Sequence, residues 1–94
     1  MSAYMLVEIA VKDEPLYARY VELVTRVVEK YQGRYVVRSS KVSPNSGGWT
    51  PDRIILIRFD TLVDLRKCFA SREYSELSPL RERSTVTRSV IVEE

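Results

Sequence analysis

The sequence predicts an α+β domain with a four-stranded antiparallel sheet that carries helices on one of its faces. Alternating and helical patterns of apolar residues follow one another in the order β-α-β-β-α-β. Two of the four predicted strands are apolar on both faces, as central strands are. The chain has 94 residues, which suffice for one hydrophobic core, so we expect a single domain over residues 1–94.

The first half of the chain predicts a strand, a helix and a second strand. Residues 3–11 alternate, with apolar side chains on both faces. Asp13 is a suitable N-cap for a helix over residues 16–31, where apolar residues recur at helical spacing. We expect Gly33 to end this helix in a left-handed conformation. Residues 34–42 then form the second strand.

The second half predicts a strand, a broken helix and a last strand. Residues 53–59 form a strand with apolar side chains on both faces. Thr61 can cap the helix that follows, and the pattern is interrupted at residues 71–74. A short helix then restarts with Ser78 as its N-cap and a proline in its first turn. Residues 86–92 alternate into the last strand.

The topology follows from the handedness of the crossovers. Right-handed connections place the first and third strands at the centre of the sheet and both helices on one face. The other face is also apolar but has no helix to cover it. Pairing with a second copy is the simplest cover, so we expect a homodimer in which two sheets pack face to face.

A long irregular connection, residues 43–53, joins the second and third strands. It holds two of the three glycines, two of the four prolines and the only tryptophan, Trp49. Loops of this length in compact domains are usually functional or disordered, and a large aromatic residue argues against disorder. Trp49 could plug the end of the sheet, close over a ligand as a lid, or contact the second copy.

Composition excludes several classes of function. The chain has no histidine and one cysteine, which rules out histidine-built zinc or copper sites, a conventional serine triad and an iron–sulfur cluster. The third strand is aliphatic where RNA-recognition modules carry stacking aromatics, and a net charge of +2 is too balanced for a nucleic-acid binder. We expect no metal, no tightly bound cofactor and no nucleic-acid partner.

The sequence also predicts where the protein resides. The longest uninterrupted apolar run has four residues, Ile54 to Ile57, whereas about 20 are needed to cross a bilayer. The N-terminal residues carry no basic region, apolar core or cleavage site of a signal peptide. The lone Cys68 fits a reducing compartment. We expect a cytoplasmic protein with no membrane partner.

Tyrosines, arginines, a few acids and one tryptophan remain as candidate functional residues. Such side chains can hold a carboxylate, polarise a carbonyl group or stack on an aromatic ring. In a pocket between the sheet and the helices, the expected ligand-binding residues are Tyr17, Tyr20, Arg38, Trp49, Arg53 and Tyr74. The candidates for catalysis are Glu8, Tyr20 and Arg38. The tyrosines could equally be core residues, and Glu8 could instead form a structural ion pair with Arg38, Arg58 or Arg88.

The order and spacing of these residues resemble the domain-of-unknown-function family 1330, nearly end to end. The matching motifs are Ala3-Tyr4, Asp13 with Tyr17 and Tyr20, Gly33-Arg34-Tyr35 with Arg38, Trp49 with Pro51 and Arg53, Phe59, Ser71-x-x-Tyr74, and Pro79-Leu80-Arg81. The resemblance implies a ferredoxin-like fold of the dimeric α+β-barrel type, in which two sheets join into one barrel. Related barrel families include cofactor-independent monooxygenases, muconolactone-type isomerases and stress-response proteins.

Two positions depart from the family pattern. A Glu-Gly pair usually precedes the loop tryptophan, and here Ser46 takes the place of the acid. The usual Trp-Tyr-Asp before Ser71 is Cys68-Phe69-Ala70. If those acids serve chemistry in the relatives, this chain lacks that chemistry or binds something different.

Two functions stay open. One is a cofactor-independent isomerase, lyase or monooxygenase-like enzyme for a small anionic or aromatic metabolite. The other is a non-catalytic dimeric module with a ligand-binding, structural or regulatory role.

Overall fold

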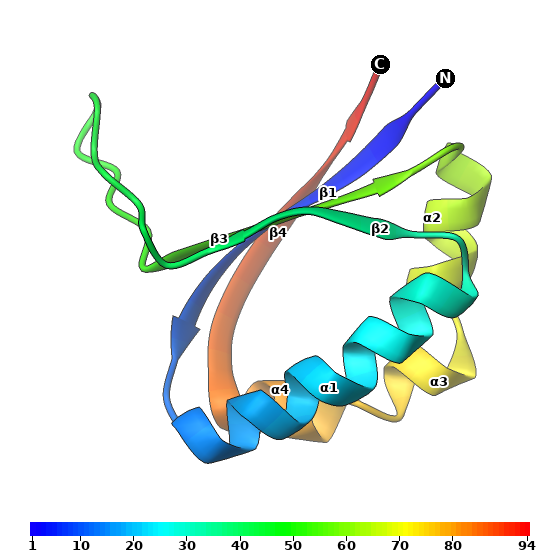
Figure 1. Ribbon diagram of the computed structural model, residues 1–94, viewed down its shortest axis with the longest axis horizontal. Helices are drawn as coiled ribbons and strands as arrows, with labels where there is room; N and C mark the ends of the chain where they lie inside the picture. Colours follow the sequence, from blue (N-terminus) through cyan, green and yellow to red (C-terminus); the bar gives the residue numbers. More distant parts are fainter.

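One antiparallel sheet carries every helix of the chain on the same face (Figure 1). A computed structural model describes residues 1–94. The elements are β1 (Ala3–Val11), α1 (Glu14–Lys30), β2 (Arg34–Ser39), β3 (Arg53–Phe59), α2 (Leu62–Phe69), α3 (Arg72–Ser75), α4 (Ser78–Ser84) and β4 (Thr85–Glu93). The strand order β2-β3-β1-β4 confirms the prediction that the first and third strands lie at the centre.

The two longer helices begin at the predicted caps. The Asp13 carboxylate accepts a hydrogen bond of 3.0 Å from the amide of Leu16. The Thr61 hydroxyl accepts one of 3.1 Å from the amide of Asp64. Both cap residues have extended backbone, which lets the side-chain oxygen reach an amide that a helix start leaves unpaired.

The prediction that Gly33 is left-handed is wrong. Gln32 takes that conformation, with φ of 69°, and the amide of Gly33 donates to the carbonyl of Val28 at 2.9 Å. Glycine is required at position 33 for space, because a Cβ atom there would lie 2.6 Å from Val28 and 2.7 Å from the Phe59 ring. The missing side chain allows the start of β2 to lie directly against the core.

Three details of the predicted pattern also need correction. β2 ends at Ser39, three residues before the predicted end, and the segment predicted as an interruption contains the single-turn helix α3. Ser78 does not cap α4, because the preceding Leu77 already has helical backbone angles and no side chain caps this start. The Leu77 amide donates to the carbonyl of Tyr74, so α3 and α4 follow each other almost without a break.

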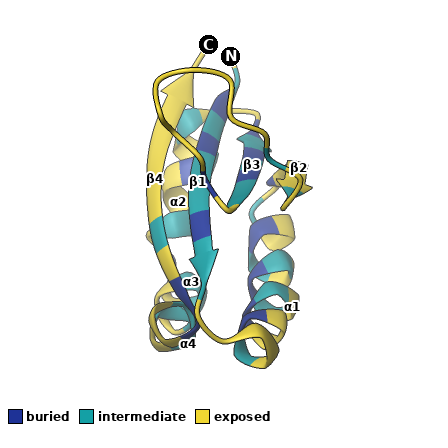
Figure 2. Ribbon diagram, turned by 90° about the vertical axis from the view of Figure 1, so that its left-hand side faces the viewer, coloured by how far each residue is buried: buried dark blue, intermediate teal, exposed yellow.

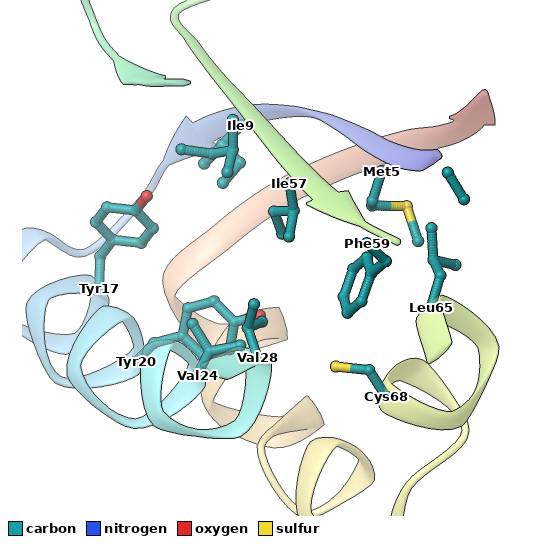
Figure 3. Close-up of a cluster of buried hydrophobic side chains, with 12 residues drawn as sticks. Met5, Ile9, Tyr17, Tyr20, Val24, Val28, Ile57, Phe59, Leu65 and Cys68 are labelled. Atoms are coloured by element: carbon teal, nitrogen blue, oxygen red, sulfur yellow. The ribbon is translucent and has the colours of Figure 1, made fainter. Parts of the chain in front are cut away.

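The hydrophobic core lies between the sheet and the helices (Figure 3). Phe59 at the end of β3, Val28 on α1 and Leu65 on α2 are among its most deeply buried residues. Burial is concentrated in β1, β3 and α1, whereas β4 and the β2–β3 loop are exposed (Figure 2). This pattern follows from alternation, since every second residue of the central strands faces the helices.

The other face of the sheet carries no helix. Leu6 on β1 lies opposite Leu56 on β3 and Val90 on β4. Val90 and Val92 are 56% and 47% exposed. The prediction of an uncovered apolar face is therefore confirmed, and a partner for it stays a prediction. None of the helices combines the length and the apolar character that spanning a bilayer requires.

Candidate functional site

A pocket of about 240 Å³ lies between the sheet and the helices. Side chains of β1 and β3 form its apolar floor, among them Ile9, Ile55 and Ile57. Its polar lining consists of Tyr20, Tyr35, Arg38, Tyr74, Arg81, Thr87, Arg88 and Ser89. No aspartate or glutamate lines it. The pocket therefore offers an apolar interior with positively charged and hydroxyl groups at its margins.

Three of the six expected ligand-binding residues line this pocket, namely Tyr20, Arg38 and Tyr74. Tyr17 and Arg53 do not. The Tyr17 side chain is buried, and the Arg53 guanidinium stacks 4.9 Å from the centre of its ring. Arg53 lies two residues before Ile55 in β3, so both side chains point to the face of the sheet that carries the helices. There Arg53 covers the Tyr17 ring. These two residues form a separate contact beside the pocket.

Trp49 lies away from the pocket, in a loop that projects beyond the sheet (Figure 1). Together with Leu6, Glu8 and Ile54 it lines a hollow of about 300 Å³ on the uncovered face. Its side chain is 49% exposed. Trp49 is therefore not a lid over the pocket between sheet and helices, and its position is one that a second copy on the uncovered face would reach.

Glu8 also faces away from the pocket. It lies opposite Arg88 on the neighbouring β4, and the Arg88 guanidinium donates to its carboxylate. The structural ion pair is thus the arrangement present. The sheet separates Glu8 from Tyr20 and Arg38, so the three candidates for catalysis do not share one site.

Tyr20, Tyr74 and Arg81 form a polar cluster inside the pocket. Arg81 Nη1 donates to the Tyr74 hydroxyl at 2.6 Å. Burial raises the pKa of Tyr20 well above its usual value, and the neighbouring Tyr74 adds to this shift. Tyr20 is therefore protonated at neutral pH, which makes it a hydrogen-bond donor rather than a general base.

A second polar cluster lies at the β2 side of the pocket. The Arg38 guanidinium stacks 3.5 Å from the centre of the Tyr35 ring, and Arg38 Nη1 donates to the Thr25 hydroxyl at 3.0 Å. Burial raises the pKa of Tyr35 to about 12. Arg38 is thereby held over an aromatic face with part of its guanidinium free for a ligand.

Five polar residues of the pocket were not expected from the sequence, namely Tyr35, Arg81, Thr87, Arg88 and Ser89. Tyr35 and Arg81 are the two that matter most for the polar clusters described above. Tyr35 and Arg81 both belong to motifs that carry the family resemblance. Arg81 reaches the pocket because α4 packs beside α1, a tertiary contact that no local pattern reveals. The signal that could have identified both residues is their place in the Gly33-Arg34-Tyr35 and Pro79-Leu80-Arg81 motifs.

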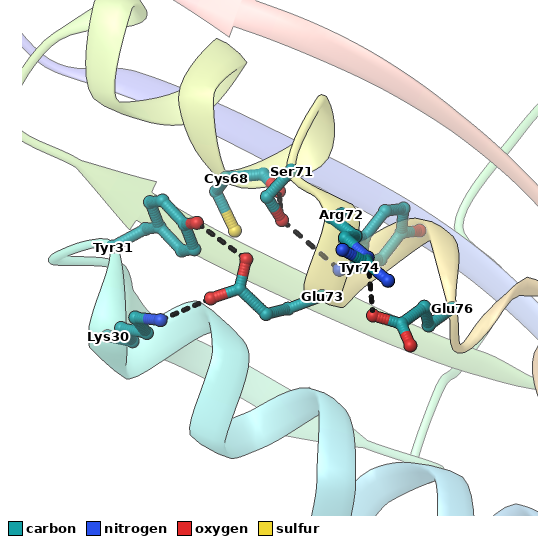
Figure 4. Close-up of polar contacts among 8 residues, drawn as sticks. All are labelled: Lys30, Tyr31, Cys68, Ser71, Arg72, Glu73, Tyr74 and Glu76. Carbon is teal, nitrogen blue, oxygen red and sulfur yellow. Dashed lines mark hydrogen bonds and ion pairs between the residues drawn. The ribbon is translucent and has the colours of Figure 1, made fainter.

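A carboxylate at Glu73 joins α3 to the end of α1 (Figure 4). The Lys30 ammonium binds one of its oxygens, and the Tyr31 hydroxyl donates to the other at 2.8 Å. The hydrogen bond from Lys30, followed by that from Tyr31, lowers the pKa of Glu73 from 4.5 to about 2. Because Glu73 adjoins Tyr74, this contact helps to fix the wall of the pocket.

We expect the Glu73 contact to make stability depend on acid pH. A folded-state pKa below the unfolded value contributes stability above about pH 4.5 that is lost as the pH falls toward about 2. Thermal unfolding followed between pH 7 and pH 2 measures this. Glu73→Gln is expected to flatten the dependence, whereas Glu76→Gln on the same segment should leave it unchanged. Equal pH profiles for Glu73→Gln and the wild type would contradict the assignment.

The protein offers the pocket neither an accessible thiol nor a cluster of metal-binding side chains. Burial raises the pKa of the Cys68 thiol to about 11, and the residue is fully buried in the core. A thiol that stays protonated and inaccessible is a poor nucleophile. No group of three or more histidine, cysteine, aspartate or glutamate side chains lies close enough together to hold a metal ion.

Solved structures of other proteins share this fold. A protein of unknown function from Rhodopseudomonas palustris has a TM-score of 0.76 at 15% identity, over 99% of this chain and 82% of that one. A dimeric protein of unknown function and ferredoxin-like fold from Bacteroides fragilis has a TM-score of 0.65 at 14% identity, over 99% and 96%. SnoaB, a cofactor-independent oxygenase from Streptomyces nogalater, has a TM-score of 0.61 at 8% identity, over 99% and 92%.

These similarities identify the fold as ferredoxin-like, and at such low identity they carry no information on activity. None of the curated proteins matches the chain in sequence. The family model for a domain of unknown function, DUF1330, matches residues 2–94. The predicted resemblance is thus confirmed, and the chain belongs to the DUF1330 family.

Proposed function

We propose that this protein binds a small anionic metabolite with an apolar or aromatic body in the pocket between sheet and helices, without a metal or tightly bound cofactor. The observation that supports this is the composition of the lining. Arg38 and Arg81 supply positive charge, the floor is aliphatic, and no carboxylate competes for the arginines from within the pocket. Arginine holds carboxylates through two parallel hydrogen bonds, which suits such a ligand.

The surroundings of the two arginines support this proposal. The nearest carboxylate to Arg81 is that of Glu82, 3.9 Å away and with a side chain 72% exposed. A pair this long and this exposed contributes little, so the Arg81 charge remains available. Arg88, the third arginine of the lining, is paired with Glu8. Two of the three arginines can therefore bind a ligand.

The volume of the pocket limits the size of the ligand. Pockets for drug-sized molecules measure about 300–1,000 Å³, and this one measures about 240 Å³. A single ring or a short branched chain with one acidic group fits such a space. The aromatic side chains Tyr20, Tyr35, Phe69 and Tyr74 would contact its apolar part.

Among chemical steps, the pocket favours polarising an oxygen over removing a proton. A protonated Tyr20 can donate to a carbonyl or enolate oxygen, in the manner of an oxyanion hole. Proton removal needs a base within hydrogen-bond reach of the substrate, and Glu8 lies on the other face of the sheet. Ligand binding is thus the function proposed, and an enzymatic role would depend on Tyr20 as a donor.

A thermal-shift screen tests this proposal. The library pairs small acids with the amides and amines of the same carbon skeleton. A ligand that binds only the folded state raises the melting temperature by mass action. We expect acids to raise it, amides and amines to leave it unchanged, and the response to weaken in Arg38→Gln and Arg81→Gln. A library in which no acid raises the melting temperature would rule out the proposed function.

We also propose that the uncovered sheet face binds a second copy of the chain. Leu6, Ile54 and Leu56 form an apolar centre on this face, and the loop with Trp49 lies beside it. The structurally similar protein from Bacteroides fragilis is described as dimeric. A homodimer would bury the exposed valines of β4 and bring Trp49 against the partner. The cytoplasmic location stays a prediction.

A further inference from the structure

One wall of the pocket carries a row of hydrogen-bonding groups. It starts at Arg81, whose guanidinium has N–H donors and no acceptor. Arg81 Nη1 donates to the Tyr74 hydroxyl at 2.6 Å, and the Arg81 guanidinium also lies 5.4 Å from the centre of the Tyr74 ring. The Tyr20 hydroxyl lies next to Tyr74 and lines the same pocket.

The hydroxyl hydrogens of Tyr74 and Tyr20 determine what this row of groups presents to a ligand. Tyr20 and Tyr74 have one hydroxyl hydrogen each, and Arg81 already donates into the Tyr74 oxygen. Neither hydroxyl donates a hydrogen bond to a group of the protein, and the Tyr74 oxygen only accepts from Arg81. The hydroxyl hydrogen of Tyr74 therefore remains for an acceptor on the ligand.

The geometry of Tyr74 is fixed from three sides. Its ring packs edge-on against Phe69, with centroids 4.9 Å apart and an angle of 90°. Its amide donates to the Ser71 hydroxyl at 3.1 Å. The preceding Glu73 is bound by Lys30 and Tyr31 on α1 (Figure 4). A donor held this firmly needs little reordering when a ligand binds.

We propose that Tyr74 and Arg81 form the binding site for the ligand's carboxylate, called the seat below. This site binds hydrogen-bond acceptors and rejects donors. This inference rests on the proposed function and adds to it where the charged group sits. Arg38, at the other end of the lining, is exposed, stacked on Tyr35 and bound to Thr25. It attracts the anion, while Tyr74 and Arg81 fix its orientation.

Calorimetric titration of the purified protein with aryl carboxylates tests the seat. The probes are benzoate, phenylacetate and 3-phenylpropionate, each compared with its primary amide. Tyr74→Phe removes the hydroxyl and keeps the ring against Phe69. We expect it to weaken carboxylate binding roughly ten- to a hundredfold, as loss of a hydrogen bond to a charged group does. Tyr4→Phe removes a hydroxyl that lies outside the pocket and donates to Glu94. It is the matched control and should bind as the wild type does.

A double-mutant cycle separates this seat from a general effect of charge. Because Arg81 donates to the Tyr74 hydroxyl and orients it, Arg81→Gln should cost less affinity in the Tyr74→Phe background than in the wild type. The exposed Arg83→Gln is the control for lost charge. If Tyr74→Phe binds the carboxylates like the wild type while Arg38→Gln does not, the seat is refuted and the pocket stands. If the wild type binds no carboxylate, the proposed function is refuted as well.

Discussion

Leu56→Glu is expected to convert the proposed homodimer to a monomer. Leu56 lies in the middle of β3 on the uncovered face, opposite Leu6 on β1 and Val37 on β2. In a face-to-face dimer its side chain would be enclosed, and an unpaired carboxylate in such a place costs several kcal/mol. Analytical ultracentrifugation at micromolar concentration measures the effect.

Val63→Glu is the matched control for Leu56→Glu. Val63 lies on α2 with its side chain 60% exposed, on the helical layer rather than the sheet face, so this variant should remain dimeric. Trp49 supplies a second readout because it is the only tryptophan. Its fluorescence should shift to longer wavelength in Leu56→Glu, as a side chain released into water does. A wild type that sediments as a monomer would contradict the dimer proposal.

Phe59→Ala is expected to cost about 3–5 kcal/mol of unfolding free energy, a large share of the roughly 5–15 kcal/mol that stabilises a typical domain. Phe59 is fully buried and packs edge-on against Phe69 at 5.8 Å. Its ring also lies against Gly33, which lacks a side chain that could move into the cavity. Urea denaturation followed by circular dichroism measures the loss.

Phe59→Leu is the control for that substitution. It keeps much of the volume and should cost distinctly less than Phe59→Ala, because the penalty grows with the cavity that remains. If Phe59→Ala costs less than about 1 kcal/mol, the core does not centre on the end of β3 as described. Similar losses of unfolding free energy in both variants would indicate that the shape of the ring, rather than the volume of the cavity, determines the loss.

The order of the elements could be predicted because it depends on local patterns. Alternation identifies the strands, helical spacing identifies α1, and the side chains of Asp13 and Thr61 determine where two helices start. The alternation of β1 likewise puts Glu8 on the same face as Leu6, away from the helices. These features concern residues close in the chain, which a single sequence contains.

The features that could not be predicted depend on distant residues. Gly33 must be glycine because the Phe59 ring, at the end of β3, leaves no room for a side chain there. Its role could therefore not be inferred from the helix end alone. Arg81 reaches the pocket only because α4 packs beside α1. The side of the sheet on which Trp49 lies depends on the path of an irregular loop, where no periodicity indicates a face.

The pocket between sheet and helices is proposed to receive a small carboxylate. The most direct test is an NMR titration of isotope-labelled protein with benzoate, read as shifts of assigned amide signals. We predict that the shifts concentrate in α1 around Tyr20, in β2 around Arg38, and from Tyr74 to Arg81. Shifts confined to the loop around Trp49 or to the uncovered face, or the absence of shifts at saturating benzoate, would contradict the account.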